Sequence, residues 1–87
     1  MQQATITVTD PAGLHARPAA VLVQTVGRYQ ARVRVEHGSR GADARSILQL
    51  LGLGVRPGSQ LTVSAEGADE ADALAAAVAV LQAPPQP

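Results

Sequence analysis

The chain has 87 residues, the length of one small domain with a single modest core. Its seven basic residues are all arginine and balance seven acidic residues, so the formal net charge is zero. A neutral chain whose one aromatic residue is Tyr29 offers neither a basic surface nor a stacking platform for bases, which argues against nucleic acid as a partner. Cysteine is absent, which excludes disulfides, thiol nucleophiles and thiolate metal sites.

Neither end of the chain resembles a membrane segment. The first residues lack the basic and apolar regions of a signal peptide, and no apolar run approaches the roughly 18 residues of a transmembrane helix. We therefore expect a cytoplasmic protein without membrane insertion. Residues 83–87 are rich in proline, which cannot continue a helix, so we expect a single domain over residues 1–82 followed by a Pro-rich tail.

The first half of the chain alternates between strand and helix periodicity. Residues 4–9 alternate strictly between apolar and polar, which predicts a half-buried strand. Helical spacing of apolar residues from Ala16 to Val26 predicts a helix, and Gly27 suits its end. Alternation returns over residues 31–36. A turn over residues 37–41 follows, and any strand after it is short and weakly indicated.

The second half predicts three more elements. Ser46 is a plausible N-cap for a brief helix over residues 47–51, residues 61–66 alternate as a strand, and Asp69 opens an Ala-rich helix that extends to about Gln82. The order β-α-β-β-α-β-α, with one apolar face per strand, predicts an α+β open-faced sandwich with an antiparallel sheet covered on one side. Periodicity does not set the strand order, and a ferredoxin-like arrangement fits nearly as well.

His15 lies at the junction between a turn and the start of the first predicted helix. The first backbone N–H groups of a helix, here those of Ala16 and Arg17, have no internal partner and favour an anion. The Arg17 side chain adds a positive charge with a donor fork that matches phosphate. Both features favour the neutral, nucleophilic imidazole and stabilise a phosphoryl group once it is attached. Because the residue before Pro18 avoids the α region, either His15 or Arg17 can cap the helix.

A histidine near a helix start is, taken alone, more often a cap or a surface residue. Arg17 beside it and the flanking Gly13 and Pro18 favour phosphoryl relay. No general base, metal-ligand set or substrate pocket is evident nearby, so a partner must supply the rest of the transfer chemistry. We therefore expect a carrier and not an enzyme, with no cofactor and no metal. His37 lies in a predicted turn without such a context.

The sequence resembles the histidine-containing phosphocarrier (HPr) family of the bacterial phosphoenolpyruvate-dependent sugar phosphotransferase system, over the chain up to about residue 82. The run Gly13-Leu14-His15-Ala16-Arg17-Pro18-Ala19 matches the motif around the family's phosphorylated histidine. Arg45-Ser46-Ile47-Leu48, followed by Leu53-Gly54-Val55, matches a second family signature. Length and element order agree with both motifs.

The resemblance implies a four-stranded antiparallel sheet with three helices on one face, and a phosphoryl relay. In the family, enzyme I is phosphorylated from phosphoenolpyruvate and passes the group to Nδ1 of the histidine that matches His15. A sugar-specific enzyme IIA then receives it, and the arginine that matches Arg17 stabilises the phosphate. The docking face shared by both partners is formed by residues that match Ala20, Gln24, Ile47, Leu48 and Leu51.

The docking face has independent support in the sequence. The helix over residues 47–51 carries more large apolar side chains than one face can bury, so some are exposed near the reactive residue, as in a docking site. Core packing is the competing interpretation; we expect it for Leu50, and it stays open for Ile47.

Ser46 raises a separate question of regulation. In many Gram-positive relatives the matching serine is phosphorylated by an HPr kinase/phosphorylase, and the added charge beside the docking face weakens transfer. Other relatives keep the serine without this regulation, so both alternatives stay open.

Three hypotheses of function follow. The leading one is a monomeric phosphocarrier for sugar uptake. The alternative is an HPr paralogue that relays phosphate in a nitrogen-related or other regulatory branch. The third is a binding module without phosphoryl chemistry, against which His15 and Arg17 argue. Gln49, the segment 42–44 and the absence of lysine depart from the family pattern and bear on partner preference.

Overall fold

The computed structural model of the chain describes residues 1–83. It contains the predicted seven elements in the predicted order: β1 (Gln2–Thr7), α1 (Ala16–Val26), β2 (Arg32–His37), β3 (Arg40–Asp43), α2 (Ile47–Leu51), β4 (Gln60–Glu66) and α3 (Glu70–Leu81). The helices α1 and α2 have the predicted bounds. None of the helices within the described range is long and apolar enough to cross a membrane.

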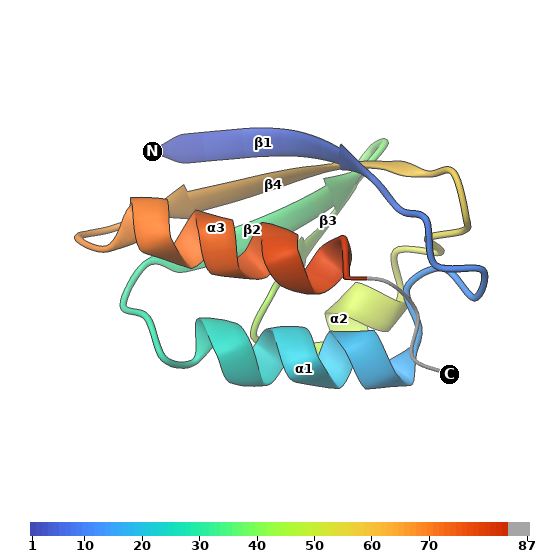
Figure 1. Cartoon of the computed structure of the whole chain (residues 1–87), viewed down its shortest axis with the longest axis horizontal. Coiled ribbons are helices and arrows are strands. Elements are labelled where there is room, and N and C mark those ends of the chain that lie inside the picture. The colour runs from blue at the N-terminus through green and yellow to red at the C-terminus, as the bar shows by residue number, and fades with distance from the viewer. Residues whose placement is uncertain (84–87) are drawn as a thin grey trace.

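The strands form one sheet in the order β1-β4-β2-β3, and every neighbouring pair is antiparallel. The three helices lie on one face of this sheet, and α1 and α3 run side by side in opposite directions (Figure 1). The α+β open-faced sandwich is thereby confirmed. A ferredoxin-like sheet pairs its first and third strands in parallel, whereas β1 pairs only with β4 among the described strands, which decides against that arrangement.

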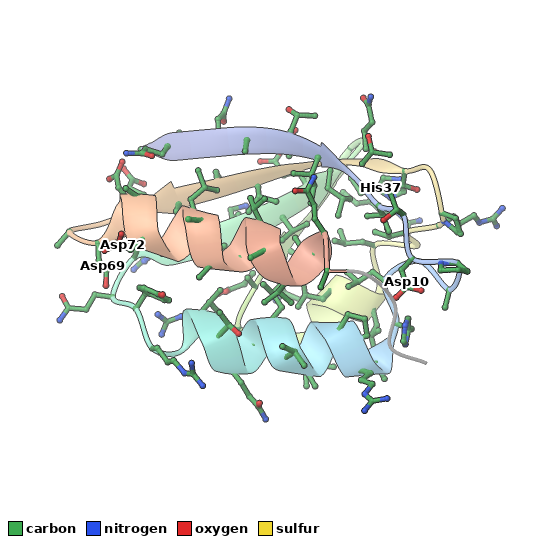
Figure 2. The ribbon with its side chains drawn as sticks, in the orientation of Figure 1. Asp10, His37, Asp69 and Asp72 are labelled. Carbon is green, nitrogen blue, oxygen red and sulfur yellow. The ribbon has the colours of Figure 1, made fainter. Side chains whose placement is uncertain are left out.

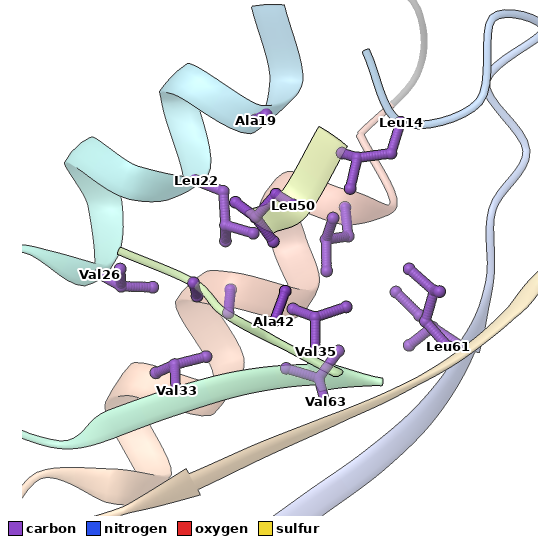
Figure 3. Close-up of a cluster of buried hydrophobic side chains, with 14 of the residues drawn as sticks. Leu14, Ala19, Leu22, Val26, Val33, Val35, Ala42, Leu50, Leu61 and Val63 are labelled. Carbon is purple, nitrogen blue, oxygen red and sulfur yellow. The ribbon is translucent and has the colours of Figure 1, made fainter. Parts of the chain in front are cut away.

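The core fills the space between the sheet and the helices (Figure 3). Alternate residues of the two central strands point into it, because side chains on a strand alternate between its two faces. They meet apolar residues at helical spacing on α1 and one residue of α2. The largest fully buried side chains are Leu22, Val26, Val33, Val35, Leu50, Leu61 and Val63. This packing anchors α1 against the sheet and fixes where its first turn lies.

Several boundaries differ from the prediction by one or two residues, among them those of β1 and the end of β2. The first strand spans Gln2–Thr7 and not residues 4–9. Gln2 and Gln3 pair with β4 through backbone hydrogen bonds, which the alternation of apolar and polar side chains does not reveal. Beyond the other end of β1, Val8 is hydrogen-bonded to the turn before β4: its N–H donates to the Ser59 carbonyl, and its carbonyl accepts the Gly58 N–H. His37 is not in the turn but closes β2, paired with Arg40 of β3.

The start of α3 ties two distant segments together. Asp69 is the N-cap residue, but its side chain makes no capping bond to its own helix. Its two carboxylate oxygens accept the backbone N–H groups of Gln30 at 2.9 Å and Ala31 at 2.8 Å, which fixes the connection from α1 to β2. The helix ends at Leu81, one residue before the predicted limit. Of the predicted tail, residues 84–87 lie outside the described part of the chain.

Candidate functional site

His15 is the N-cap residue of α1. Its backbone is extended, with φ −122° and ψ −175°, and its carbonyl oxygen accepts the N–H of Ala19 at 3.1 Å, the first hydrogen bond of the helix. Its side chain is 40% exposed and makes no capping bond. The structure thus decides between the two predicted caps in favour of His15, and it leaves the imidazole accessible to another protein.

The first turn of α1 presents free donors beside the imidazole. Within residues 1–83, the N–H groups of Ala16 and Arg17 have no backbone hydrogen-bond partner, and Pro18 has no N–H to leave unpaired. The Arg17 side chain is exposed and forms no ion pair with any described residue. Two free N–H groups at the positive end of the helix therefore lie next to His15, and the exposed Arg17 follows two residues further on, an arrangement that suits a bound phosphate.

The loop before α1 is held from both sides. Gly13 has a positive φ of +68°, and its N–H bonds to the Asp10 carbonyl at 2.9 Å. Leu14 is buried in the core, and its N–H reaches the carbonyl of Val55 at 3.4 Å. His15 is therefore displayed by a chain segment that is anchored immediately before it by a buried leucine and immediately after it by the helix.

Asp10 is a site residue that the sequence reasoning missed. Its Oδ2 lies 3.4 Å from Nε2 of His15, and its Oδ1 accepts the N–H of Ala12 at 2.8 Å. Figure 2 shows Asp10 in the loop next to the start of α1, at the same end of the molecule as His37. The available signal was an aspartate at the first position of an Asp-Pro-Ala-Gly turn, because such an aspartate binds the N–H two residues further on.

A groove of about 640 Å³ opens beside His15. One wall is the loop and first turn that contain Asp10, His15 and Arg17, and the other is the C-terminal end of α3 from Ala79 to Leu81. Most of the lining is apolar, with these three charged or titratable groups on one wall. The sequence did not reveal this groove, because its second wall comes from a helix more than sixty residues further along the chain.

The predicted docking residues lie on α1 and α2, which pack against each other next to His15 (Figure 1). Leu48 is 83% exposed, while Ile47 and Leu51 are each 40% exposed. Gln24 is exposed and Ala20 is half-buried. Leu50 is fully buried, as expected, and Ile47 is not part of the core. The helix α2 therefore buries one leucine and leaves three large apolar side chains at the surface.

Ser46 is the N-cap of α2, as predicted. Its Oγ accepts the N–H of Gln49 at 3.2 Å, and the side chain is half-buried. The Gln49 side chain in turn accepts the N–H of Asp43 at 2.9 Å and ties α2 to β3. A phosphate on Ser46 would lie at the start of the helix that carries Ile47 and Leu48.

His37 has a structural role at the same end of the molecule. Its Nδ1–H donates to the carbonyl of Leu53 at 2.8 Å, and the neighbouring Arg40 donates to the carbonyl of Gly52 at 3.0 Å. These bonds hold the segment that leaves α2. Across residues 1–83, no three histidine, aspartate or glutamate side chains are grouped so that they could hold a metal ion.

Comparison with known proteins agrees with this geometry. The family model described as the PTS HPr component phosphorylation site matches residues 2–83. HPr-C-His from Thermoanaerobacter tengcongensis is 40% identical with a TM-score of 0.87, over 93% of this chain and 91% of that one. A phosphocarrier protein HPr from Bacillus anthracis is 36% identical with a TM-score of 0.87, over 93% and 96%.

A third similar structure is that of Crh, a catabolite repression protein from Bacillus subtilis described as a domain-swapped dimer. It is 37% identical with a TM-score of 0.75, over 93% of each chain. The motif around His15, the four-stranded sheet with its three helices, and the family match over residues 2–83 all agree. This chain is a member of the HPr phosphocarrier family.

Proposed function

We propose that this chain is a phosphoryl carrier that receives a phosphoryl group from phosphorylated enzyme I on Nδ1 of His15 and delivers it to enzyme IIA components. The observation that carries the proposal is the position of His15, half-exposed at the N-cap of α1 and next to two unpaired N–H groups and Arg17. A family match that contains this histidine supports it.

The transfer needs no proton-transfer group on this chain. The lone pair of Nδ1 attacks phosphorus, and the bond from phosphorus to the donor breaks with its electron pair returning to the donor. The N–H groups of Ala16 and Arg17 and the Arg17 guanidinium then face the phosphoryl oxygens and stabilise their negative charge. In the second transfer an acceptor histidine on enzyme IIA attacks the same phosphorus, and the pair returns to Nδ1. The chain is thus a covalent intermediate between two phosphotransferases.

Enzyme I and enzyme IIA bind, in this proposal, to the same docking face, which comprises Ala20, Gln24, Ile47, Leu48 and Leu51. Three exposed apolar side chains on α2 offer area whose burial stabilises a complex, and they lie beside the exposed N-cap of α1. A single copy of the chain presents both His15 and the docking face, so the active form in this proposal is the monomer. Ser46 lies at the edge of this face, where a phosphate would add repulsive and desolvation costs.

A two-step relay assay tests the proposal. The chain is phosphorylated with enzyme I, magnesium and labelled phosphoenolpyruvate, separated from enzyme I, and then mixed with a purified enzyme IIA. We expect label to enter the wild-type chain, to leave it when enzyme IIA is added, and to be absent from His15→Ala. Label that enters His15→Ala, or that stays on the wild-type chain after addition of an active enzyme IIA, would contradict the proposal.

A further inference from the structure

Asp10 contacts only one of the two ring nitrogens of His15, Nε2, and this bears on which nitrogen is the nucleophile. The Asp10 side chain is only 19% exposed, and each of its carboxylate oxygens has one partner. Oδ1 accepts the Ala12 N–H at 2.8 Å, while Oδ2 lies 3.4 Å from Nε2 of His15. The backbone of Asp10 is held as well, because its carbonyl accepts the Gly13 N–H at 2.9 Å. The turn therefore orients the carboxylate so that Oδ2 faces His15.

A neutral imidazole carries its proton on one nitrogen and a lone pair on the other, and the partner of either nitrogen selects the tautomer. A carboxylate only accepts hydrogen bonds, so Oδ2 of Asp10 favours the tautomer with the proton on Nε2. The lone pair then lies on Nδ1, which has no hydrogen-bond partner within residues 1–83. An aspartate that holds a histidine in one tautomer is a recurring device in nucleophilic catalysis.

We propose that Asp10 is a positioning residue that holds His15 in the Nε2–H tautomer and so directs phosphoryl transfer to Nδ1. This inference rests on the proposed phosphoryl transfer to His15. When Nδ1 bonds to phosphorus, the Nε2 proton stays in place and the ring gains positive charge, while the donor keeps the electron pair of the broken bond. That charge faces the Asp10 carboxylate. The separation of 3.4 Å is longer than the usual ~2.9 Å, and it is expected to shorten when the ring becomes cationic.

The competing role for Asp10 is structural, as a cap of the Ala12 N–H. Asp10→Asn separates the two roles because an amide oxygen still caps Ala12. With that oxygen engaged, the amide NH₂ lies where Oδ2 faced Nε2, and it donates to a nitrogen lone pair there. Asn at this position therefore favours the Nδ1–H tautomer and blocks the nucleophile. If Asp10 only caps the turn, Asp10→Asn keeps the wild-type tautomer of His15 and the wild-type rate of phosphorylation. If Asp10 positions His15, both the tautomer and the rate change.

Asp43 offers a matched control. Its Oδ1 accepts the N–H of Arg45, two residues further on, at 2.9 Å, as Asp10 does with Ala12, but the bond lies at the end of β3. Asp43→Asn makes the same chemical change in the same kind of turn without a histidine beside it. Any general effect of replacing a turn aspartate is therefore measured separately.

The experiment has two readouts. The first is the ¹⁵N NMR spectrum of the His15 ring in the unphosphorylated proteins, at a pH where the imidazole is neutral. We expect the Nε2–H tautomer in the wild type and in Asp43→Asn, and a shift of the proton toward Nδ1 in Asp10→Asn. An unchanged tautomer in Asp10→Asn, or an Nδ1–H tautomer in the wild type, overturns the proposal whether or not the chain is phosphorylated.

The second readout is the rate of phosphorylation by enzyme I as a function of the concentration of the chain. We expect Asp10→Asn to lower kcat by roughly tenfold or more with little change in KM, because the docking face is untouched. Equal kcat values for Asp10→Asn and the wild type overturn the positioning role and leave the carrier function standing. A wild type that is never phosphorylated on His15 refutes the carrier function, and the NMR readout still decides the role of Asp10.

Discussion

Gly13 lies against the carbonyl oxygen of Val55 so closely that a side chain does not fit between them. Its φ of +68° is also in the region that other residues rarely adopt. This close approach lets Leu14 enter the core and places His15 at the start of α1. The backbone at Val55 therefore supports the loop that precedes His15.

Gly13→Ala tests this support. We expect a loss of about 2 kcal/mol or more in the free energy of unfolding, because alanine is strained at this positive φ and its methyl group collides with the backbone of Val55. Gly38→Ala is the control, since Gly38 has a similar φ of +61° but open space around it. Urea denaturation of both variants measures the difference. Equal losses in the two variants would show that the close approach of Gly13 to Val55 does not affect the free energy of unfolding.

Leu48 and Leu50 lie two residues apart on α2 and have opposite surroundings. Leu48→Arg is expected to change the free energy of unfolding by no more than about 0.5 kcal/mol, because the Leu48 side chain is 83% exposed. The same substitution is expected to raise the KM for enzyme I, because it replaces an apolar side chain of the docking face by a charged one. Leu50→Ala should lose about 2–5 kcal/mol, because it leaves a cavity in the core. Thermal unfolding and initial rates of phosphorylation separate the two effects. An unchanged KM for Leu48→Arg would remove Leu48 from the docking face.

Ser46 combines a cap with a position beside the docking face. Ser46→Ala should lose about 1 kcal/mol of stability, because the bond to the Gln49 N–H is lost. Ser46→Asp keeps a capping oxygen, so it should be close to wild type in stability while its negative charge lowers the rate of transfer several-fold. Comparing unfolding midpoints with relay rates checks both statements. A Ser46→Asp variant that relays as fast as wild type would argue against regulation at this serine.

Asp69 makes stability depend on pH. The N–H groups of Gln30 and Ala31 donate to its carboxylate and hold the pKa of Asp69 below its ordinary value. A lowered pKa in the folded state means that this stabilisation is complete above the ordinary value of about 3.9 and is lost as the pH falls through the lowered one. Asp69→Asn resembles the protonated form, so its unfolding temperature should lie below wild type at pH 7 and converge with it in acid. Parallel curves down to about pH 2 would contradict this assignment.

The sequence predicted local features well and long-range ones poorly. The bounds of α1 and α2 followed from apolar spacing and from the Ser46 cap, which are properties of a few neighbouring residues. Strand order did not follow, because β1 and β4 pair through backbone groups that every residue carries. The role of Asp69 was missed for a similar reason, since its partners are backbone N–H groups 38 and 39 positions earlier in the chain.

The candidate site shows the same difference between local features and features that depend on distant residues. His15 and Arg17 were found because a short motif contains both, and the exposure of α2 followed from its surplus of apolar residues. The contact of Asp10 with His15 depends on a turn whose shape is set by Gly13 and its fit against Val55. The groove depends on the end of α3 meeting the first loop. Both are products of tertiary packing.

The most direct test of the central claim is the site of phosphorylation. The pure chain and a His15→Ala variant are incubated with enzyme I, magnesium and phosphoenolpyruvate, and intact mass and acid lability are recorded. We predict one acid-labile phosphoryl group on the wild type, none on the variant, and a phosphorus–nitrogen coupling to Nδ1 in the NMR spectrum. A phosphoryl group on another residue, or none with an enzyme I that is active on another carrier, would contradict the assignment of His15 as the carrier residue.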